Sequence, residues 1–441
     1  MQRVLILGAG LVTRPIVRYL LEEAGLKVKV ASRTVSKAEK LIGGHPHGEA
    51  QALDVEDASA LETAVRQADV VISLLPWIHH LAVAKLCIKH RKHMVTTSYV
   101  SDAMRALDGD VRGAGLLFLN EIGVDPGIDH MSAMQIIRAV KKDGGKVTSF
   151  RSYCGGLPAP QHDTNPWGYK FSWSPRGVVL AARNSARYRE DGRLVEVPSW
   201  DLFATVRYLR VEGVGVLEAY PNRDSLGYVD LYGLEGIETM YRGTLRFPGH
   251  CATWVAIGRS GLLDLDERVG MADKTLAELV GGLCGADAAH AKEAFARKAG
   301  VPVWSNQIER LEWLGMFGDE KIGVDRISPL DVLARRLDAK LTYAEGELDM
   351  IALCHEFIAV KAGKRELITS QLVDFGIPGG DSSMARTVSL PAAIATRLLC
   401  EGKLAATGVR IPVDPEIYEP VLAGLAQQNI VCKEARRPLA R

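Results

Sequence analysis

The sequence lacks close cysteine pairs, an excess of charge of one sign, and long apolar runs. Its seven cysteines are dispersed with no C-x-x-C spacing, which excludes a disulfide framework and a cysteine-based zinc site and favours reduced thiols. Lys plus Arg number 54 and Asp plus Glu number 53, so the net charge is +1. No bulk positive field therefore exists to bind nucleic acid or a membrane surface.

No segment approaches the roughly 18 consecutive apolar residues that cross a bilayer. The first apolar run, Val4 to Leu7, is also too short for the core of a secretory signal. We therefore expect a soluble, cytoplasmic protein.

The 441 residues, 47% hydrophobic and 24% charged, are ordinary globular material. At about 150 residues per domain they predict two or three domains. Over the first 125 residues, short β-branched runs alternate with helical patterns, which predicts an α/β fold with a parallel, doubly wound sheet. The predicted strands are Val4 to Leu7, Val28 to Ala31, Ala50 to Leu53, Val70 to Leu74, Met94 to Thr97 and Leu116 to Asn120.

After Asp125 the pattern changes, because Gly and Pro punctuate more widely spaced apolar runs. We expect a mixed-sheet α+β substrate domain with an all-helical insert, a helix over Gly346 to Phe357, a hairpin over Lys361 to Phe375, and an apolar helix from Gly379 to Leu399 that packs on the first domain. The predicted domains are 1–128 completed by 380–441, 129–260 with 345–379, and the insert 261–344.

The first predicted strand runs directly into Gly8 to Thr13, which reads GAGLVT. This matches the dinucleotide fingerprint G-x-G-x-x-G except that Thr13 stands at the third glycine position. The first glycine permits a tight turn, and the second lets the backbone approach a pyrophosphate at a helix N-terminus. Because the motif lies between a strand pattern and a helix pattern, it favours dinucleotide binding over a plain turn.

The end of the second strand indicates which dinucleotide binds. A NAD site places an acid against the ribose hydroxyls, but this chain has Ser32-Arg33-Thr34. An arginine and two hydroxyls would bind a 2′-phosphate, so NADP is favoured over NAD. Asp54 and Val55 follow the third strand, where Asp54 could border the adenine or cap a helix over Glu56 to Ala68.

The turn Asn120 to His130 follows the sixth strand and carries two acids in a Gly-rich setting. Asp125 could act near a nicotinamide, whereas Asp129 is better placed to cap a helix running from His130 to Val140. The histidine pairs in the sequence lack carboxylates at ligand spacing, so we expect no metal site.

The runs Ser152 to Pro160 and Asn165 to Ser174 combine glycines, prolines and aromatics. They predict a loop that closes over a ligand, with Lys170 as a possible cation and Cys154 as a thiol that could equally be buried packing. Arg223 and the segment Arg242 to Arg246 stand in turn-rich settings, where guanidinium groups bind carboxylates or make surface ion pairs.

In order along the chain, these motifs closely resemble the saccharopine dehydrogenase family of the NADP-dependent, L-glutamate-forming kind. The similarity covers nearly the whole chain, and the runs CGGLPAP and YKFSWS are its most specific parts. The matching segments are 8–12, 31–34, 53–55, 70–76, 95–99, 120–130, 152–160, 168–174, 220–225, 242–246 and 379–385.

The resemblance implies condensation of L-glutamate with 2-aminoadipate 6-semialdehyde through an imine that NADPH reduces to saccharopine, or the reverse, in lysine metabolism by the aminoadipate pathway. The implied NADP(H)-binding positions are Gly8, Gly10, Leu11, Val12, Thr13, Ser32, Arg33, Thr34, Asp54, Val55, Leu75, Thr97, Val124, Asp125, Pro126, Gly127, Ile128, Asp129, His130, Met131 and Ser174. The implied substrate positions are Ser98, Tyr99, Arg223, Thr244, Leu245 and Arg246.

For the proton transfers we expect Asp125, Cys154 and Tyr99 to act, because forming and dehydrating a carbinolamine needs an acid and a base. Two alternatives stay open: a carboxynorspermidine-type dehydrogenase, or an NADPH-binding regulatory protein without turnover. The resemblance also implies a homodimer, and neither the physiological direction nor the role of each proton-transfer residue follows from the sequence.

Overall fold

The structure is a computed structural model that describes residues 2–173 and 175–439. The chain divides into two units, each described by itself below. Unit 1 comprises Met1–Lys146 and Gly376–Glu434, and unit 2 comprises Val147–Phe375 and Ala435–Arg441. Within the described ranges, no helix is both long enough and apolar enough to span a membrane.

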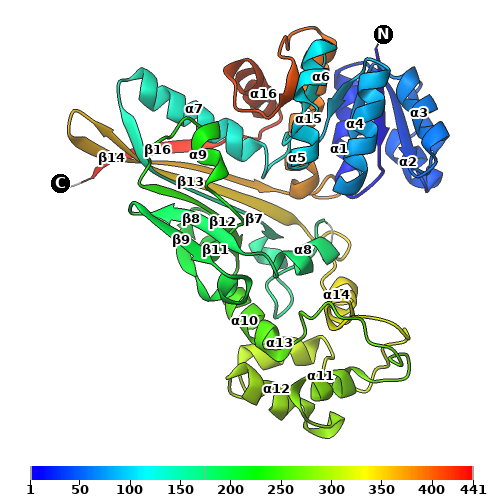
Figure 1. Cartoon of the computed structure of the whole chain (residues 1–441), viewed down its shortest axis with the longest axis vertical. Helices are drawn as coiled ribbons and strands as arrows, with labels where there is room; N and C mark the ends of the chain where they lie inside the picture. The colour runs from blue at the N-terminus through cyan, green and yellow to red at the C-terminus, as the bar shows by residue number, and fades with distance from the viewer. Residues whose placement is uncertain (1, 174, 440–441) are drawn as a thin grey trace. The chain divides into compact units, whose positions relative to one another are not determined.

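Unit 1 is built on a seven-stranded sheet (Figure 1) in the order β15-β6-β5-β4-β1-β2-β3, in which every pairing is parallel. The strands are β1 (Arg3–Leu7), β2 (Lys27–Ser32), β3 (Gly48–Ala52), β4 (Val70–Ser73), β5 (His93–Val95), β6 (Leu117–Leu119) and β15 (Gly408–Arg410). The six predicted strands agree with β1 to β6 within two residues at each end. The predicted doubly wound α/β fold is therefore confirmed. Its strand order reverses between β1 and β4, the point at which such sheets bind ligands at their carboxyl edge.

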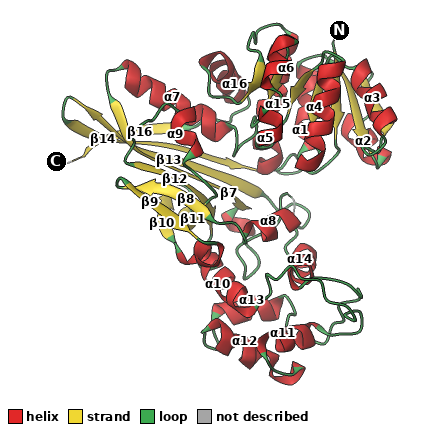
Figure 2. Ribbon diagram, in the orientation of Figure 1, coloured by secondary structure: helices red, strands yellow, loops and turns green. Residues whose placement is uncertain are grey.

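Helices connect these strands (Figure 2), and the central strands β1 and β4 are buried, as apolar strands between two helical layers should be. The helices of unit 1 are α1 (Thr13–Arg18), α2 (Val35–Ile42), α3 (Ala58–Gln67), α4 (His80–Lys89), α5 (Asp102–Arg105), α6 (Asp108–Gly113), α7 (Ile128–Lys142), α15 (Ser383–Cys400) and α16 (Pro415–Gln427). A π-helical turn (Tyr19–Glu23) continues α1, and a 3-10 turn (Trp77–His79) precedes α4.

The helix predicted from Gly379 to Leu399 is α15, which begins after the N-cap Ser382, whose hydroxyl accepts from the Ala385 N–H. Helix α15 packs against α1. Arg14 at the start of α1 pairs with Asp381 at 3.0 Å, and the Ser389 hydroxyl donates to the Val12 carbonyl. The C-terminal part of the chain thus supports the turn between β1 and α1.

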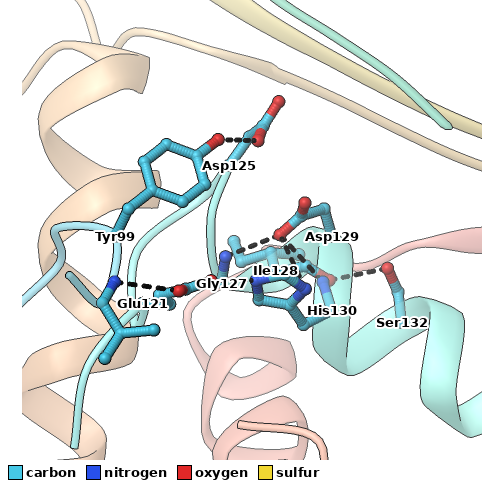
Figure 3. A network of polar contacts seen from close by, with 9 residues as sticks. Tyr99, Glu121, Asp125, Gly127, Ile128, Asp129, His130 and Ser132 are labelled. Atoms are coloured by element: carbon cyan, nitrogen blue, oxygen red, sulfur yellow. Dashed lines mark hydrogen bonds and ion pairs between the residues drawn. The ribbon is translucent and has the colours of Figure 1, made fainter. Parts of the chain in front are cut away.

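A buried contact between Glu121 and His130 connects the loops that follow β5 and β6. One Glu121 carboxylate oxygen lies 2.8 Å from His130 Nε2, and the other accepts from the Val100 N–H at 2.9 Å (Figure 3). The two side chains of the pair are 5% and 0% exposed. Glu121 itself has a φ of 55°, a left-handed conformation that costs a residue with a side chain free energy. Glu121 therefore holds the Val100 loop against the first turn of α7.

Unit 2 contains a nine-stranded mixed sheet with the main order β10-β11-β12-β7-β13-β14-β16, in which β8 pairs with β12 and β9. Strands β7 and β12 are parallel, while β11 pairs antiparallel with both β10 and β12. The strands are β7 (Lys146–Pro158), β8 (Ala186–Glu190), β9 (Arg193–Val197), β10 (Arg207–Val211), β11 (Gly215–Pro221), β12 (Thr239–Arg246), β13 (Asp349–Lys361), β14 (Lys364–Phe375) and β16 (Lys433–Leu439).

The helix predicted over Gly346 to Phe357 is wrong, because that segment forms most of strand β13. Residues 349–355 are buried without interruption, so the strand is apolar on both faces and its sequence shows no alternation. Strand β13 pairs antiparallel with β14 along its whole length, from Met350 opposite Phe375 to Lys361 opposite Lys364. The hairpin thus includes β13 and runs from Asp349 to Phe375, whereas the prediction began at Lys361. Residues 380–441 were predicted to complete the first domain. The last of them, strand β16, instead pairs with β14 in the sheet of unit 2.

The helices of unit 2 include the group that lies within the predicted insert. They are α8 (Pro175–Ala181), α9 (Gly227–Leu231), α10 (His250–Ser260), α11 (Leu276–Cys284), α12 (Ala291–Ala299), α13 (Asn306–Trp313) and α14 (Pro329–Lys340). Helices α11 and α12 pack on each other, and α10 contacts α12 and α13 (Figure 1). Helix α11 starts with a capping box, in which Thr275 and Glu278 each accept from the other's backbone N–H.

The Glu121 network predicts a large stability difference between two glutamate variants. Glu121→Ala should lower the free energy of unfolding by about 3 kcal/mol, since it removes the buried carboxylate that bonds to the His130 ring and accepts from the Val100 N–H. The control Glu22→Ala removes an exposed pair with Arg18 and should cost at most about 0.5 kcal/mol. Urea unfolding and hydrogen exchange of the α7 amides measure both effects. Equal stability losses in the two variants would contradict this account.

Candidate active site

The segment Gly8 to Thr13 forms a turn shaped for close backbone approach. Gly8 has a φ of 115°, and a Cβ there would lie 3.0 Å from the Leu74 carbonyl oxygen. The Cβ position of Gly10 instead has nothing within 4 Å. Leu11, at the tip, is exposed. The first two glycines of the fingerprint therefore meet the two demands that the motif makes of them.

Thr13 does more than replace the third glycine. Its hydroxyl accepts from the Gly10 N–H at 3.0 Å and lies 3.5 Å from the Gly8 carbonyl, to which it donates. The side chain is fully buried. The buried Thr13 hydroxyl thus links the backbone of Gly8 to that of Gly10 and fixes the shape of the turn.

The residues predicted to bind the 2′-phosphate follow β2 at the carboxyl edge of the sheet. Arg33 and Thr34 are exposed, and the Ser32 hydroxyl accepts from the Thr34 N–H at 3.3 Å. Across residues 2–173 and 175–439, no carboxylate pairs with Arg33. Its guanidinium is therefore available to an anion.

Asp54 does not cap the helix that follows it, so that alternative is wrong. Its carboxylate accepts from the Glu56 N–H at 3.1 Å in a local turn, whereas the N-cap of α3 is Asp57, which accepts from Ser59 and Ala60. Asp54 is exposed and Val55 is half-buried beside it at the end of β3.

Leu75, Thr97, Ser98 and Tyr99 lie just after β4 and β5 at the same carboxyl edge. Tyr99 donates its hydroxyl to Asp125 Oδ1 at 3.1 Å (Figure 3). The fold thus brings together two of the three residues predicted for proton transfer. Cys154, the third, belongs to unit 2.

The turn Val124 to Met131 leads into α7, which begins two residues earlier than predicted. The N-cap is Gly127, and Asp129 lies in the first turn instead of capping a helix that starts at His130. Its carboxylate still accepts from backbone N–H groups, Gly127 at 2.6 Å and His130 at 2.8 Å. A carboxylate at this end of a helix is favourable because the N-terminal N–H groups carry partial positive charge.

A buried histidine, missed at the sequence level, lies beside Ser98. His80 begins α4; its Nδ1 lies 2.9 Å from Ser73 Oγ and its Nε2 lies 2.9 Å from Ser98 Oγ. Burial lowers the pKa of His80 to about 4, with a smaller contribution from His79, so the ring is neutral near pH 7. The sequence showed only a histidine pair without metal-ligand spacing.

In unit 2, the run Ser152 to Pro158 belongs to strand β7, so the predicted closing loop is wrong over that part. Cys154 is buried and lies opposite Thr244 of β12 in parallel register. Gly155 is required because a Cβ there would lie 2.6 Å from the Leu245 carbonyl. The glycines therefore serve close strand packing rather than loop movement.

Arg246, at the end of β12, is a buried cation without an acidic partner. Its guanidinium lies 4.8 Å from the Tyr169 ring centre and 5.9 Å from that of Tyr220. Nη1 donates to the Leu245 carbonyl at 2.8 Å, but Nε has no hydrogen-bond partner. Within the described residues, no carboxylate pairs with this guanidinium.

The surroundings of Arg246 leave its charge uncompensated. Burial raises the pKa of both Tyr169 and Tyr220, so both stay neutral. Burial, followed by the charge of Arg246, holds the pKa of the nearby His250 well below its usual range. Tyr169 and Tyr220 stood in the predicted segments, but no spacing signal identified them as the walls around Arg246.

The remaining predicted residues of unit 2 occupy varied settings. Arg223 is exposed with a φ of 53°. Thr244 is half-buried opposite Tyr220, and Leu245 is fully buried in the core. Lys170 is not a free cation, because it pairs with Glu347 at 2.5 Å and donates to Thr164 at 2.8 Å. Ser174 lies outside the described residues.

No cluster of three or more potential His, Cys, Asp or Glu metal ligands occurs in the part of the chain that the structure describes. The polar groups that converge at the two candidate sites are hydroxyls, carboxylates, imidazole and guanidinium. They can bind anions and transfer protons.

Comparisons with known proteins cover the whole chain. Two family models match: the saccharopine dehydrogenase NADP binding domain over residues 4–119 and the saccharopine dehydrogenase C-terminal domain over residues 123–431. The saccharopine dehydrogenase [NADP(+), L-glutamate-forming] of Schizosaccharomyces pombe is 40% identical over 98% of this chain and 99% of its own length. The mitochondrial alpha-aminoadipic semialdehyde synthase of Bos taurus is 37% identical over 98% of this chain and 47% of its own length.

Among solved structures, the apo histidine-tagged saccharopine dehydrogenase (L-Glu forming) of Saccharomyces cerevisiae is similar, with a TM-score of 0.90 and 40% identity. The match covers 99% of this chain and all of that chain. Both domain families, the full-length relatives and the solved structure agree, and they agree with the motifs. The chain belongs to the saccharopine dehydrogenase family.

Proposed function

We propose that this chain is an NADP-dependent oxidoreductase with the L-glutamate-forming saccharopine dehydrogenase activity. In the oxidative direction, saccharopine, NADP⁺ and water give L-glutamate, 2-aminoadipate 6-semialdehyde, NADPH and a proton. The observation that carries the proposal is Arg246, whose buried guanidinium has an unpartnered Nε and no carboxylate among the described residues. Saccharopine carries three carboxylates, and one of them would supply the missing charge.

Physical reasoning supports a carboxylate as the ligand of Arg246. A buried, unpaired charge destabilises a fold strongly, so it persists where a bound partner compensates it. The flanking faces of Tyr169 and Tyr220 hold the guanidinium by cation–π attraction and leave its edge for an anion. We assign Arg246, Thr244 and Leu245, with Arg223, Ser98 and Tyr99, to substrate binding.

The cofactor positions fit NADP(H) on several counts. The open space at Gly10 admits a pyrophosphate, and the exposed Arg33 would hold the 2′-phosphate with the hydroxyls of Ser32 and Thr34. When bound, NADPH supplies the hydride that reduces the imine carbon. The residues of this chain would position that cofactor at the carboxyl edge, where Leu75, Thr97 and the Val124 to Met131 turn lie.

We assign the proton transfers to Tyr99 and Asp125 of unit 1 and to Cys154 of unit 2. Tyr99 and Asp125 are hydrogen-bonded, so one can donate while the other accepts as the carbinolamine forms and loses water. Cys154 is buried beside Thr244, a predicted substrate position.

The alternatives fit less well. A carboxynorspermidine-type dehydrogenase would bind a diamine and an aldehyde with one carboxylate, so its diamine would call for acidic residues, whereas the predicted substrate segments of this chain offer Arg223 and Arg246. A purely regulatory NADPH-binding protein has no need of the buried Arg246. NADPH absorbance with glutamate and aminoadipate semialdehyde, and then with aspartate semialdehyde and diaminopropane, distinguishes all three.

We also propose that the enzyme serves lysine biosynthesis, is cytoplasmic and forms a homodimer. All seven cysteines are thiols, which suits a reducing compartment. In unit 2, Tyr208 on the edge strand β10, Leu194 on the edge strand β9 and Trp200 in the turn before β10 are exposed, and exposed edges of this kind suit pairing with a second copy.

Arg246→Met is predicted to weaken the binding of saccharopine without lowering the thermal stability of the protein. It should raise the KM for saccharopine at least about 100-fold, because a charge-assisted pair is lost, while thermal stability stays unchanged or rises as an unpaired charge leaves the interior. The control Arg310→Met removes a buried guanidinium that donates to Pro166 and Thr253, and it should lower stability. Steady-state kinetics and thermal unfolding of both variants test this, and loss of stability in Arg246→Met would contradict the assignment.

Arg33→Ala is predicted to weaken NADPH binding about 10-fold to 100-fold while changing NADH binding much less, because only NADPH carries the 2′-phosphate. Lys27→Ala, at the other end of β2, serves as the control. Fluorescence titration with both cofactors measures the effect. An equal loss for NADPH and NADH would overturn the assignment of Arg33.

The proton-transfer variants Tyr99→Phe, Asp125→Ala and Cys154→Ser should each lower kcat, by about 100-fold or more for a residue that carries a proton in the transition state. The control Ser59→Ala changes an exposed position on α3 and should leave kcat unchanged. The readout is kcat across pH. If none of the three variants changes the profile, these residues do not transfer protons.

A further inference from the structure

His80 is placed to control the hydroxyl of Ser98, a residue assigned above to substrate binding. The side chain is 5% exposed and lies at the carboxyl ends of the neighbouring strands β4 and β5. Its two ring nitrogens connect Ser73, the last residue of β4, with Ser98 beyond β5, each at 2.9 Å. A third hydroxyl, that of Thr96, lies 3.4 Å from Nε2.

The direction of these hydrogen bonds follows from the burial of Ser73. Ser73 is fully buried, and its hydroxyl has one partner among the described residues, His80 Nδ1. If Nδ1 carried the proton, the Ser73 hydroxyl proton would point into the interior without an acceptor, which native structures avoid. The buried Thr96 hydroxyl makes the competing demand on Nε2, but at 3.4 Å against 2.9 Å for the contact between Ser73 and Nδ1. The shorter contact is the stronger hydrogen bond, so Ser73 donates to Nδ1 and the proton of the neutral ring resides on Nε2.

The proton on His80 Nε2 also determines whether the Ser98 hydroxyl can donate a hydrogen bond to a ligand. Nε2–H donates to Ser98 Oγ, so the Ser98 hydroxyl must use its own proton elsewhere. The Ser98 backbone cannot turn away, because its N–H donates to Thr96 Oγ1 at 3.3 Å and its carbonyl accepts from the Glu121 N–H at 3.1 Å. Ser98 is half-buried at the carboxyl edge of the sheet, where a ligand oxygen can accept that proton.

We propose that His80 is a positioning residue that holds the Ser98 hydroxyl as a hydrogen-bond donor toward a carboxylate oxygen of the substrate, through the relay Ser73, His80, Ser98. This inference rests on the proposed function and adds a residue that acts on substrate binding without touching substrate. Burial keeps the pKa of His80 near 4, so the ring holds a single proton throughout the neutral range.

The first test reads the tautomer in the free protein and does not depend on the reaction. In ¹⁵N-histidine-labelled protein, the His80 ring signals are identified by their loss in His80→Gln, among the 11 histidines of the chain. We expect the shift of an unprotonated Nδ1 and a protonated Nε2. A protonated Nδ1 would overturn the inference, whatever the enzyme's substrate is.

The second test is a double-mutant cycle with saccharopine and NADP⁺. His80→Asn keeps an amide near Ser73 but cannot reach Ser98, and it should raise the KM for saccharopine about 10-fold with little change in kcat. His80→Gln, whose amide nitrogen reaches the position of Nε2, should recover most of that loss. In a Ser98→Ala background, His80→Asn should add nothing further.

The control His90→Asn changes a partly exposed histidine at the end of α4 that bonds to Glu62, and it should leave KM unchanged. A 10-fold rise in KM for His80→Asn in the Ser98→Ala background would overturn the inference, since His80 would then act independently of Ser98. If His80→Asn does not fold, His80→Gln alone and with Ser98→Ala completes the cycle. If wild-type protein oxidises no saccharopine, the proposed function fails. The tautomer experiment still tests whether Ser73 donates to His80 Nδ1 and His80 Nε2 donates to Ser98.

Discussion

The arrangement of the candidate site in unit 1 depends on one buried carboxylate. Glu121 binds His130 with one oxygen and the Val100 N–H with the other, so a single side chain fixes the loop after β5 against the start of α7. Tyr99 lies in the loop after β5, and Asp125 lies in the loop between β6 and α7. Their hydrogen bond exists because these two loops are held together. The strained backbone of Glu121 indicates that the surrounding structure enforces this position.

Unit 2 shows the opposite use of a buried charge. Arg310 donates to the carbonyls of Pro166 and Pro248 and to the Thr253 hydroxyl, so it holds the helices of the unit together. Arg246 is buried as deeply but lies between aromatic rings with one nitrogen unpartnered. Two arginines of equal burial thus differ in whether the fold itself satisfies them. Under the proposed function, that difference separates a structural cation from the arginine assigned to a substrate carboxylate.

The sequence predicted what depends on local pattern. Strands β1 to β6 and the turn at Gly8 were found because strand, glycine and helix signals coincide over short distances. Strand β13 was missed because burial on both faces removes alternation, and Asp54 was offered as a cap because Asp57 is three residues away and chemically identical. The aromatic walls of Arg246 and the His80 relay join residues that only the folded chain brings close, so no spacing could indicate them.

The chain passes between the two units three times, after Lys146, after Phe375 and after Glu434. During synthesis, the first 146 residues leave the ribosome long before β15 and α15 exist. Until then β6 is an unpaired parallel edge and α1 lacks the helix that packs on it. The sheet of the nascent dinucleotide unit therefore stays incomplete until more than 200 residues of unit 2 have been synthesised.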